Sequence, residues 1–433
     1  MTDSNATLLT LDLLKGLVGG GAVAIRGTAT LEPAGGPGDK VFPPSHSIDK
    51  NNHEPGAKYA FEQRRIESRE VSCVLLDSVQ SQANRMEEAL EYLWAEKQIA
   101  LPVVEVDFSQ AAPDVGVVTS LSAPHRVADA LLRDSVTVDG TFFRMSDIGK
   151  SFSESTTRNA GALFKVCPTG LVFGLWDSTG PRGGLGSKFA RALVSEIVGI
   201  GATVGAKTSS RIDPTSIVTN AGPVLVASAP GPDGKPTWTL DVMAAKPLKE
   251  GKPPKDAKDV AAVEKWGEGQ KAGKPSAINH SNIPPTVDDT AGGVTIDSAL
   301  HTVVLSLAAL RKLAFGGGDL EARTVLAALG LLAVLAAESR GHDLRSRCLL
   351  VPKKGRALRL EAVRGDGETE AVGLDLSGAL TLFNAAVAAL PERLRFSNKP
   401  GEPLVTLRPS PKLADLVRKS RELAAVGADI DAG

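Results

Sequence analysis

Cysteine is scarce in this sequence, with only Cys73, Cys167 and Cys348 among 433 residues. Three cysteines are too few for a disulfide framework, and none of them shows the spacing of a zinc-binding motif. Cys73 and Cys167 lie in apolar runs typical of strands, and Cys348 follows a basic loop. We therefore expect ordinary thiols in a protein of the reducing cytoplasm.

An excess of charge of one sign is also absent, because 49 Lys and Arg nearly cancel 50 Asp and Glu. This balance argues against a globally basic nucleic-acid coat or a polybasic membrane binder, so any anion-binding site must be local. The apolar uncharged run at residues 324–337 has 14 residues, fewer than the ~18 to 20 that cross a bilayer. Asp3 and Asp12 without a basic segment are unlike a secretory signal. We expect a soluble protein that makes no membrane contact.

The clearest local pattern is a strand followed by a helix. Residues 71–76 form an apolar run that ends at Asp77, and Gln80 stands three positions later, as in a capping box. Apolar residues on one side of the following segment predict a helix of about 20 residues that ends near Lys97.

A second unit of this kind is predicted further along the chain. Residues 171–176 read as a strand, residues 177–186 as a glycine-rich turn, and residues 187–200 as a helix whose apolar residues recur every four positions. Two such units predict an α+β fold with helices on one face of the sheet, as in an RNA-recognition-motif-like (ferredoxin-like) palm. The spacing alone fits a doubly wound sheet equally well.

The rest of the chain predicts insertions and helices. Residues 246–275 contain eight Lys and five acidic residues among repeated Pro and Gly, the composition of an exposed loop. Ala- and Leu-rich stretches at 296–314 and 320–340 predict helices. The expected organisation is a palm over 1–245 with a loop insertion at 32–70, the exposed loop 246–275, and a mainly helical C-terminal part over 276–433 that completes the fold.

Positive charge is concentrated between residues 143 and 211, a stretch that contains nine Lys and Arg but only four acidic residues. Arg182 lies in a glycine-rich turn, and Lys188 and Arg191 follow it on one face of the predicted helix. Free backbone N–H groups and cations at a helix start favour a phosphate. The spacing excludes a Walker P-loop, because Ser187 separates Gly186 from Lys188. The alternative is a turn followed by a solvated basic helix face.

The start of the helix after Asp77 is polar, with Gln80, Gln82, Asn84 and Arg85 in its first turns. Amides and cations of this kind suit contacts to sugar and phosphate that carry no sequence preference. Taken alone, these residues are explained more simply by capping and solvation. Further along, the pair His125-Arg126 after a proline offers a similar polar group.

Catalytic patterns are weak. His46, His53 and His125 could supply acid–base chemistry for RNA cleavage, and Ser45-His46 could suggest a nucleophile with its base, but scattered loop histidines explain them as well. The histidines at 280, 301 and 342 show no metal-ligand spacing. We expect no enzyme activity, no metal and no cofactor.

Several strings of the sequence resemble one known family. They are FPPS at 42–45, VLLDSVQSQANRME at 74–87, APHR at 123–126, FGLWDSTG at 173–180 and KFAR at 188–191. These strings are similar to the RAMP-superfamily backbone subunit of type I-G (formerly I-U) CRISPR surveillance (Cascade) complexes. The resemblance covers residues 20–215, and the 14-residue run is its most specific part.

The resemblance implies a subunit that polymerises along a CRISPR RNA and presents the spacer to complementary DNA. Its implied partners are the CRISPR RNA, the target DNA strand, further copies of itself and other subunits of the complex, in the cytoplasm. The implied RNA-binding positions are Gln80, Gln82, Asn84, Arg85, His125, Arg126, Ser178, Arg182, Lys188 and Arg191. Two alternatives remain open: a CRISPR RNA-processing endonuclease of the same superfamily with His46 or His125 as base, and an assembly protein that binds no nucleic acid.

Overall fold

The structure is a computed structural model that describes residues 6–46, 58–180, 187–232, 234–249 and 252–427. The chain divides into two compact units. The first unit comprises residues 1–205 and 293–421, and the second comprises residues 206–292 with 422–433. Both strands and helices contribute to the first unit, which confirms the predicted α+β class.

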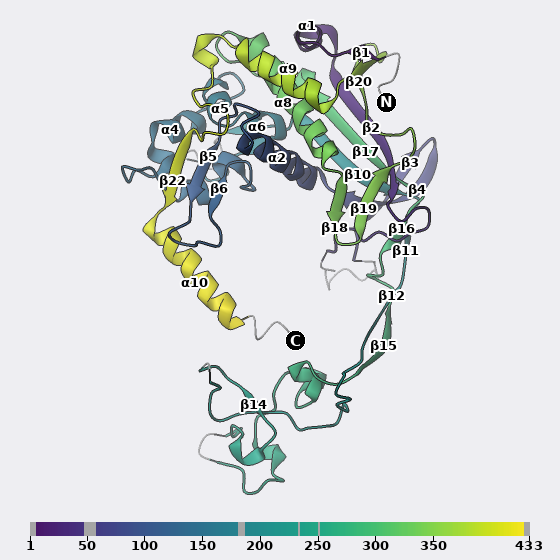
Figure 1. Cartoon of the computed structure of the whole chain (residues 1–433), viewed down its shortest axis with the longest axis vertical. Helices are drawn as coiled ribbons and strands as arrows, with labels where there is room; N and C mark the ends of the chain where they lie inside the picture. Colours follow the sequence, from purple (N-terminus) through teal and green to yellow (C-terminus); the bar gives the residue numbers. More distant parts are fainter. Residues whose placement is uncertain (1–5, 47–57, 181–186, 233, 250–251, 428–433) are drawn as a thin grey trace. The chain divides into compact units, whose positions relative to one another are not determined.

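A ten-stranded sheet forms the framework of the first unit, with the strand order β1-β21-β20-β2-β17-β10-β4-β3 and with β19 joining β18 to β2 (Figure 1). Its strands are β1 (Thr7–Leu8), β2 (Ala24–Pro33), β3 (Phe61–Ile66), β4 (Arg69–Asp77), β10 (Leu193–Ile200), β17 (Ser298–Ser306), β18 (His342–Arg345), β19 (Cys348–Pro352), β20 (Arg359–Val363) and β21 (Thr369–Gly373). Strands that lie far apart in the sequence are neighbours here, because β17 pairs antiparallel with both β2 and β10.

Helices cover one face of this sheet (Figure 1). The covering helices are α1 (Leu11–Gly16), α2 (Val79–Ala95), α8 (Asp319–Ser339) and α9 (Leu376–Ala388). β2 buries Ile25, Ala29 and Leu31 and exposes Arg26 and Thr28 between them, so the sheet has one packed face and one open face.

Helix α8 lies at the centre of the core. Most of its residues are buried, and it contacts α2 and α9 as well as β17. In the part of the chain that the structure describes, α8 is the one helix whose length and composition would suit a membrane span. A helix that is apolar on all sides also forms when neighbours bury it within a protein core, and α8 is surrounded in this way.

A second, four-stranded sheet in the order β6-β5-β22-β7 accompanies shorter helices in the first unit. Its strands are β5 (Val104–Asp107), β6 (Val117–Thr119), β7 (Ser135–Val136) and β22 (Val405–Pro409). The remaining α-helices of the described residues are α3 (Ala130–Arg133), α4 (Asp147–Ser153), α5 (Gly161–Val166), α6 (Pro168–Phe173), α7 (Leu307–Leu310) and α10 (Pro411–Gly427). Of these, α3 contacts β5 and β22, whereas α7 contacts β2 and α8. β22 runs parallel to β5, which brings the C-terminal part of the chain beside residues 104–106.

Several element predictions are confirmed. The strand at 71–76 lies within β4, the helix after Asp77 is α2, and the predicted helix at 320–340 is α8. The helix cap differs in detail, because the hydroxyl of Ser78, and not Asp77, accepts from the backbone N–H of Ser81.

The predicted helix over 187–200 is wrong, because residues 193–200 form strand β10. Phe189, Leu193 and Ile197 are spaced by four, and a spacing of four is also a multiple of the two-residue period of a strand. The predicted strand at 171–176 is wrong for most of its length, since α6 ends at Phe173. Likewise the predicted helix over 296–314 is wrong, because residues 298–306 form strand β17 and only the short α7 follows it. Strands β17 to β22 make the C-terminal part mixed rather than mainly helical.

The second unit takes in more of the chain than the predicted exposed loop. It contains the pairs β12 (Lys207–Arg211) with β15 (Ile283–Asp288) and β13 (Leu225–Val226) with β14 (Trp238–Thr239). Leu225, Val242, Ala245 and Val263 form a small apolar cluster within it. The predicted exposed loop was bounded at residues 245 and 275, whereas the second unit begins at residue 206 and continues to residue 292.

Candidate nucleic-acid interface

An exposed aromatic side chain and a cation lie together on a short hairpin of the first unit. Strands β8 (Leu175–Trp176) and β9 (Lys188–Phe189) pair antiparallel, with Trp176 opposite Lys188. Leu175 and Phe189 are buried, which turns the other two side chains outward. Trp176 is 57% exposed, and the Lys188 ammonium lies 5.3 Å from the centroid of its ring. A ring for stacking beside a cation for phosphate suits single-stranded nucleic acid.

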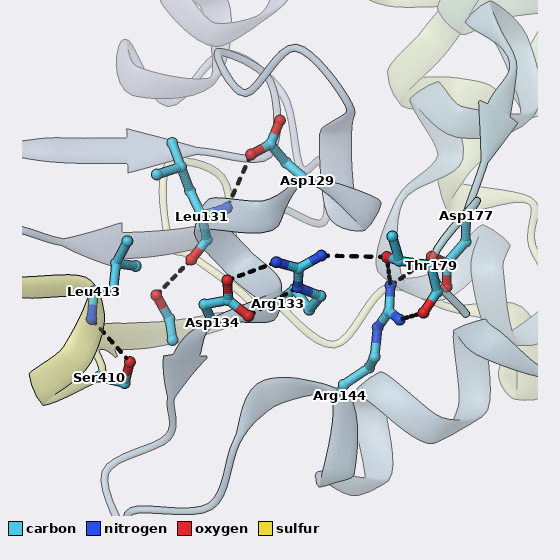
Figure 2. A network of polar contacts seen from close by, with 10 residues as sticks. Asp129, Leu131, Arg133, Asp134, Arg144, Asp177, Thr179, Ser410 and Leu413 are labelled. Atoms are coloured by element: carbon cyan, nitrogen blue, oxygen red, sulfur yellow. Dashed lines mark hydrogen bonds and ion pairs between the residues drawn. The ribbon is translucent and has the colours of Figure 1, made fainter. Parts of the chain in front are cut away.

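Arginines within the protein hold the turn that follows Trp176 (Figure 2). The buried carboxylate of Asp177 is paired with Arg144, which also donates to the backbone carbonyl of Thr179. Arg133 donates to the Thr179 hydroxyl at 3.4 Å and is paired with Asp134. Arg144 belongs to the basic stretch noted in the sequence, but its charge is balanced inside the fold. Ser178 remains exposed in this turn.

Arg126 holds the backbone just before β8 from inside the protein. This residue is 8% exposed, and its guanidinium makes two 2.7 Å hydrogen bonds to Glu87 and one of 3.0 Å to the carbonyl of Gly174. Burial raises the pKa of Glu87 to about 7, against the opposing effect of Arg126. Arg126 therefore positions the hairpin from inside the protein, which corrects the expectation that it contacts RNA. His125 beside it is exposed.

The predicted contact residues at the start of α2 separate into two groups. Gln80 and Asn84 are exposed. Gln82 is buried, with its amide nitrogen 2.6 Å from Asp77 and its amide oxygen accepting from Ser195 at 2.8 Å. This places Gln82 inside the protein rather than on an RNA-facing surface, contrary to the expectation.

Arg85 is half-buried and is engaged within the fold. It donates to Asp77 at 2.9 Å and to the backbone carbonyl of Leu344. Asp77 is fully buried and is also paired with Arg345 at 3.2 Å. The charge of Arg85 is therefore committed to a buried carboxylate, which argues against its expected role as a free phosphate ligand.

The structure brings some of the predicted site residues to one place. Ser178, Lys188 and Arg191 are exposed along the hairpin and its flanks, although Lys188 and Arg191 share no helix. Arg191 lies against Gly174, where an added Cβ would be 3.0 Å from its Cγ. Arg182 lies outside the described residues. Gln80 and Asn84 lie on α2 and not on the hairpin.

Two features of the described residues were missed in the sequence. Trp176 stands in the string FGLWDSTG, and an aromatic residue next to a basic, glycine-rich turn was the available signal. His301, Glu338 and His342 come together with their ligand atoms within 4.8 Å of one another, although the histidines show no metal-ligand spacing in the sequence. Glu338 lies in the last turn of α8, His342 is the first residue of β18 and His301 comes from β17, so no single element carries the cluster.

Comparisons with known proteins give one family match. Residues 25–204 match the model of the family described as CRISPR-associated protein GSU0053. No curated protein matches the chain. Among solved structures, Csc2 from Thermofilum pendens is similar at 9% identity over 96% of this chain and 81% of that protein. Its TM-score of 0.25 does not establish a shared fold. Residues 25–204, which include the hairpin, are thus similar to a CRISPR-associated family.

Proposed function

We propose that this protein is an RNA-binding backbone subunit of a type I-G CRISPR interference complex, and that the hairpin of Trp176 and Lys188 contacts the guide RNA. The observation that carries the proposal is an exposed aromatic ring paired with an exposed cation, within residues similar to a CRISPR-associated family. Stacking on Trp176 accepts any base, and Lys188 with Arg191 suits the phosphate backbone. Such a site holds RNA without reading its sequence.

The order of the central strands supports an RNA-recognition-motif-like palm. The strands β20-β2-β17-β10 are neighbours in that order. Along the chain, α2 lies between β2 and β10, and α8 lies between β17 and β20. This is the β-α-β-β-α-β pattern of the ferredoxin-like fold, with β3 and β4 added beyond β10. The open face of the sheet and the hairpin would then be available to RNA.

The proposed subunit is a scaffold rather than an enzyme. Copies of it would lie side by side on the guide RNA with the other subunits of a cytoplasmic complex, and base pairing between guide and target DNA would supply the sequence specificity. Each copy contacts few nucleotides, so binding gains strength from neighbours on the same strand and depends on salt.

Alanine substitutions in the hairpin test the RNA contact. Trp176→Ala should weaken binding of the guide RNA about 5- to 150-fold, the equivalent of ~1 to 3 kcal/mol for a lost stacking contact. Lys188→Ala should lower the slope of log K against log salt by about 0.7 for one lost phosphate contact. Fluorescence anisotropy at several salt concentrations measures both quantities.

Tyr92→Ala provides a matched control. Tyr92 is 55% exposed and has the guanidinium of Arg340 5.5 Å from its ring centroid. The pair resembles that of Trp176 and Lys188, but Tyr92 lies on α2 and Arg340 directly after α8. Tyr92→Ala should leave RNA affinity unchanged. If Trp176→Ala and Lys188→Ala bind RNA like the unaltered protein, or if Tyr92→Ala weakens binding as much, the hairpin is not the contact site.

The length of the guide RNA tests the assembly. Native mass measurement should find subunits added in discrete steps as the guide is lengthened, with the RNA intact. A fixed stoichiometry at every length would contradict the scaffold. Cleavage of repeat RNA that disappears on His46→Ala or His125→Ala would favour the endonuclease instead.

A further inference from the structure

Three potential metal ligands meet next to a cavity in the first unit. His301 comes from β17, Glu338 from the last turn of α8, and His342 from the first position of β18. A Glu338 carboxylate oxygen, Oε1, lies 3.0 Å from His301 Nδ1 and 3.5 Å from His342 Nε2. Both histidine side chains are buried, at 4% and 8% exposure. Helix α8 and strands β17 and β18 therefore converge on this cluster.

A chain of hydrogen bonds determines where His301 carries its proton. The carboxylate of Asp77 lies between Arg85 and Arg345 and can only accept, so the side chain of Gln82 must turn its NH₂ group toward Asp77. The oxygen of this amide then faces Ser195, whose hydroxyl donates its single hydrogen to it at 2.8 Å.

The Ser195 oxygen can then only accept from its other neighbour. That neighbour is His301 Nε2, at 2.8 Å. The proton of a neutral His301 must therefore be on Nε2, and its Nδ1 carries a free lone pair.

This arrangement leaves a lone pair facing an anionic oxygen. His301 Nδ1 is buried without an aligned hydrogen bond, although the Glu338 oxygen lies 3.0 Å away. Two electron-rich atoms at this distance repel each other unless a cation lies between them or His301 takes up a second proton. Ligand atoms of a tetrahedral zinc ion are about 3.3 Å apart, given bond lengths of ~2.0 to 2.1 Å. The two distances to the Glu338 oxygen, 3.0 and 3.5 Å, bracket this value, and all three ligand atoms lie within 4.8 Å of one another.

We propose that His301, Glu338 and His342 bind a single zinc ion. Two imidazoles and one carboxylate are a known zinc donor set, whereas magnesium and calcium prefer oxygen ligands throughout. Ser195 acts as a positioning residue, because its hydrogen bond holds the His301 ring in the tautomer that a metal requires. This site is independent of the RNA contact proposed above.

The surroundings admit the ion. A cavity of about 230 Å³ is lined by all three residues, which provides an entry path and leaves room for a water molecule as fourth ligand. Arg85 and Arg340 also line the cavity, but they are paired with Asp77 and Glu88. Their positive charge is thus largely offset near the site. A bound ion would tie the end of α8 to β17 and β18.

Zinc content and affinity of the full chain test the proposal. After dialysis against a chelator, the protein should bind about one equivalent of added ZnCl₂ in a competition titration, and zinc should raise its melting temperature. Cobalt(II) should give the visible absorption of a four-coordinate ion. Glu338→Gln and His342→Gln should each lower zinc affinity at least tenfold, whereas His125→Gln, an exposed histidine, should not.

Ser195→Ala keeps all three ligands and should lower zinc affinity about 10- to 100-fold. Circular dichroism checks that each variant is folded. If the variants of the ligand residues do not fold, the zinc affinity of Ser195→Ala tests the site. Failure of the unaltered protein to bind zinc, or unchanged affinity in folded Glu338→Gln, would overturn the site. The cluster would then be a protonated histidine paired with Glu338, visible by NMR as a His301 imidazolium.

Discussion

At the scale of single residues, the environment of each arginine decides what it does. Arg126 and Arg191 are both cations in strings that resemble one family, yet Arg126 is buried against Glu87 and Arg191 is exposed. Arg126 also has a positive φ of 54°, an uncommon backbone conformation outside glycine that the surrounding contacts stabilise. Arg126 therefore supports the fold, and Arg191 remains available to a ligand.

The buried pair of Arg126 and Glu87 gives a prediction about stability. Arg126→Leu removes the guanidinium and leaves the buried Glu87 carboxyl and the Gly174 carbonyl without their hydrogen-bond donor, which should cost about 3 to 5 kcal/mol of unfolding free energy. Arg418→Ala, which breaks the exposed pair of Arg418 and Asp415, should cost less than about 1 kcal/mol. Urea unfolding followed by circular dichroism measures both, and equal effects would contradict the structural role of Arg126.

Asp213 in the second unit gives a prediction about pH. Hydrogen bonds from Thr215 and from the backbone of Ser281 lower the pKa of this carboxyl to about 2. Since the pKa in the unfolded chain is about 3.9, the ionised form stabilises the fold above pH ~4, and this contribution is lost as pH falls toward 2. The amide resonances of Thr215 and Ser281 should shift with a midpoint near pH 2. A midpoint near 4 would contradict these contacts.

At the scale of elements, strand β10 links the sheet to both proposed sites. Its Ser195 positions His301, and the residues just before it carry Lys188 and Arg191. Alternate residues Leu193, Ser195 and Ile197 are buried on one side of β10. A helix over the same residues would place Ser195 on a different face from Leu193. The two-residue period of the strand is therefore what puts Ser195 on the buried side, where it contacts His301.

Gly199 in β10 tests the packing of this element. An added Cβ would lie 2.8 Å from Ile296 Cγ2 and 3.0 Å from Val74 Cγ1, so Gly199→Ala should lower the unfolding free energy by about 1 to 3 kcal/mol through overpacking. Gly16 lies at the end of α1 with nothing within 4 Å of an added Cβ. Gly16→Ala should be neutral or stabilise by up to ~1 kcal/mol. Thermal melts compare the two, and a neutral Gly199→Ala would mean that β10 is packed differently.

At the scale of the whole molecule, the framework sheet is assembled from both ends of the chain. The residues matched by the CRISPR-associated family, 25–204, supply most of β2 and all of β4, α2 and β10. β17, α8 and β20 come from after the second unit. The sheet is therefore complete only when residues beyond 293 return to pair with β2 and β10.

Because the chain re-enters the first unit next to the point where it leaves, we expect the first unit to fold without residues 206–292. The backbone N–H of Gly205 donates to the carbonyl of Gly293 at 2.8 Å, so the two ends of the first unit lie together and a short linker can join them. A chain without residues 206–292 should keep a cooperative thermal transition and the circular dichroism of the α+β sheet. Loss of cooperative unfolding would show that the first unit depends on the second for its stability.

The sequence by itself determined the features that depend on neighbours along the chain. The α+β class, strand β4 with helix α2, and helix α8 follow from apolar periodicity and from a polar helix start. The exposed hairpin residues Lys188 and Arg191 were found from local charge and glycine content. Where a spacing of four fitted both a helix and a strand, as in β10, the local pattern was insufficient, because pairing with β17 and β4 selects the strand.

Only the tertiary structure decided which polar residues are engaged with one another. Gln82, Arg85 and Arg126 look like surface ligands in the sequence, but partners from distant segments, such as Ser195 and Leu344, hold them inside the fold. His301 meets Glu338 and His342 because β17 and the end of α8 are packed together. These contacts form because whole elements bury their surfaces against each other. The free energy of that burial cannot be read from the spacing of residues along the sequence.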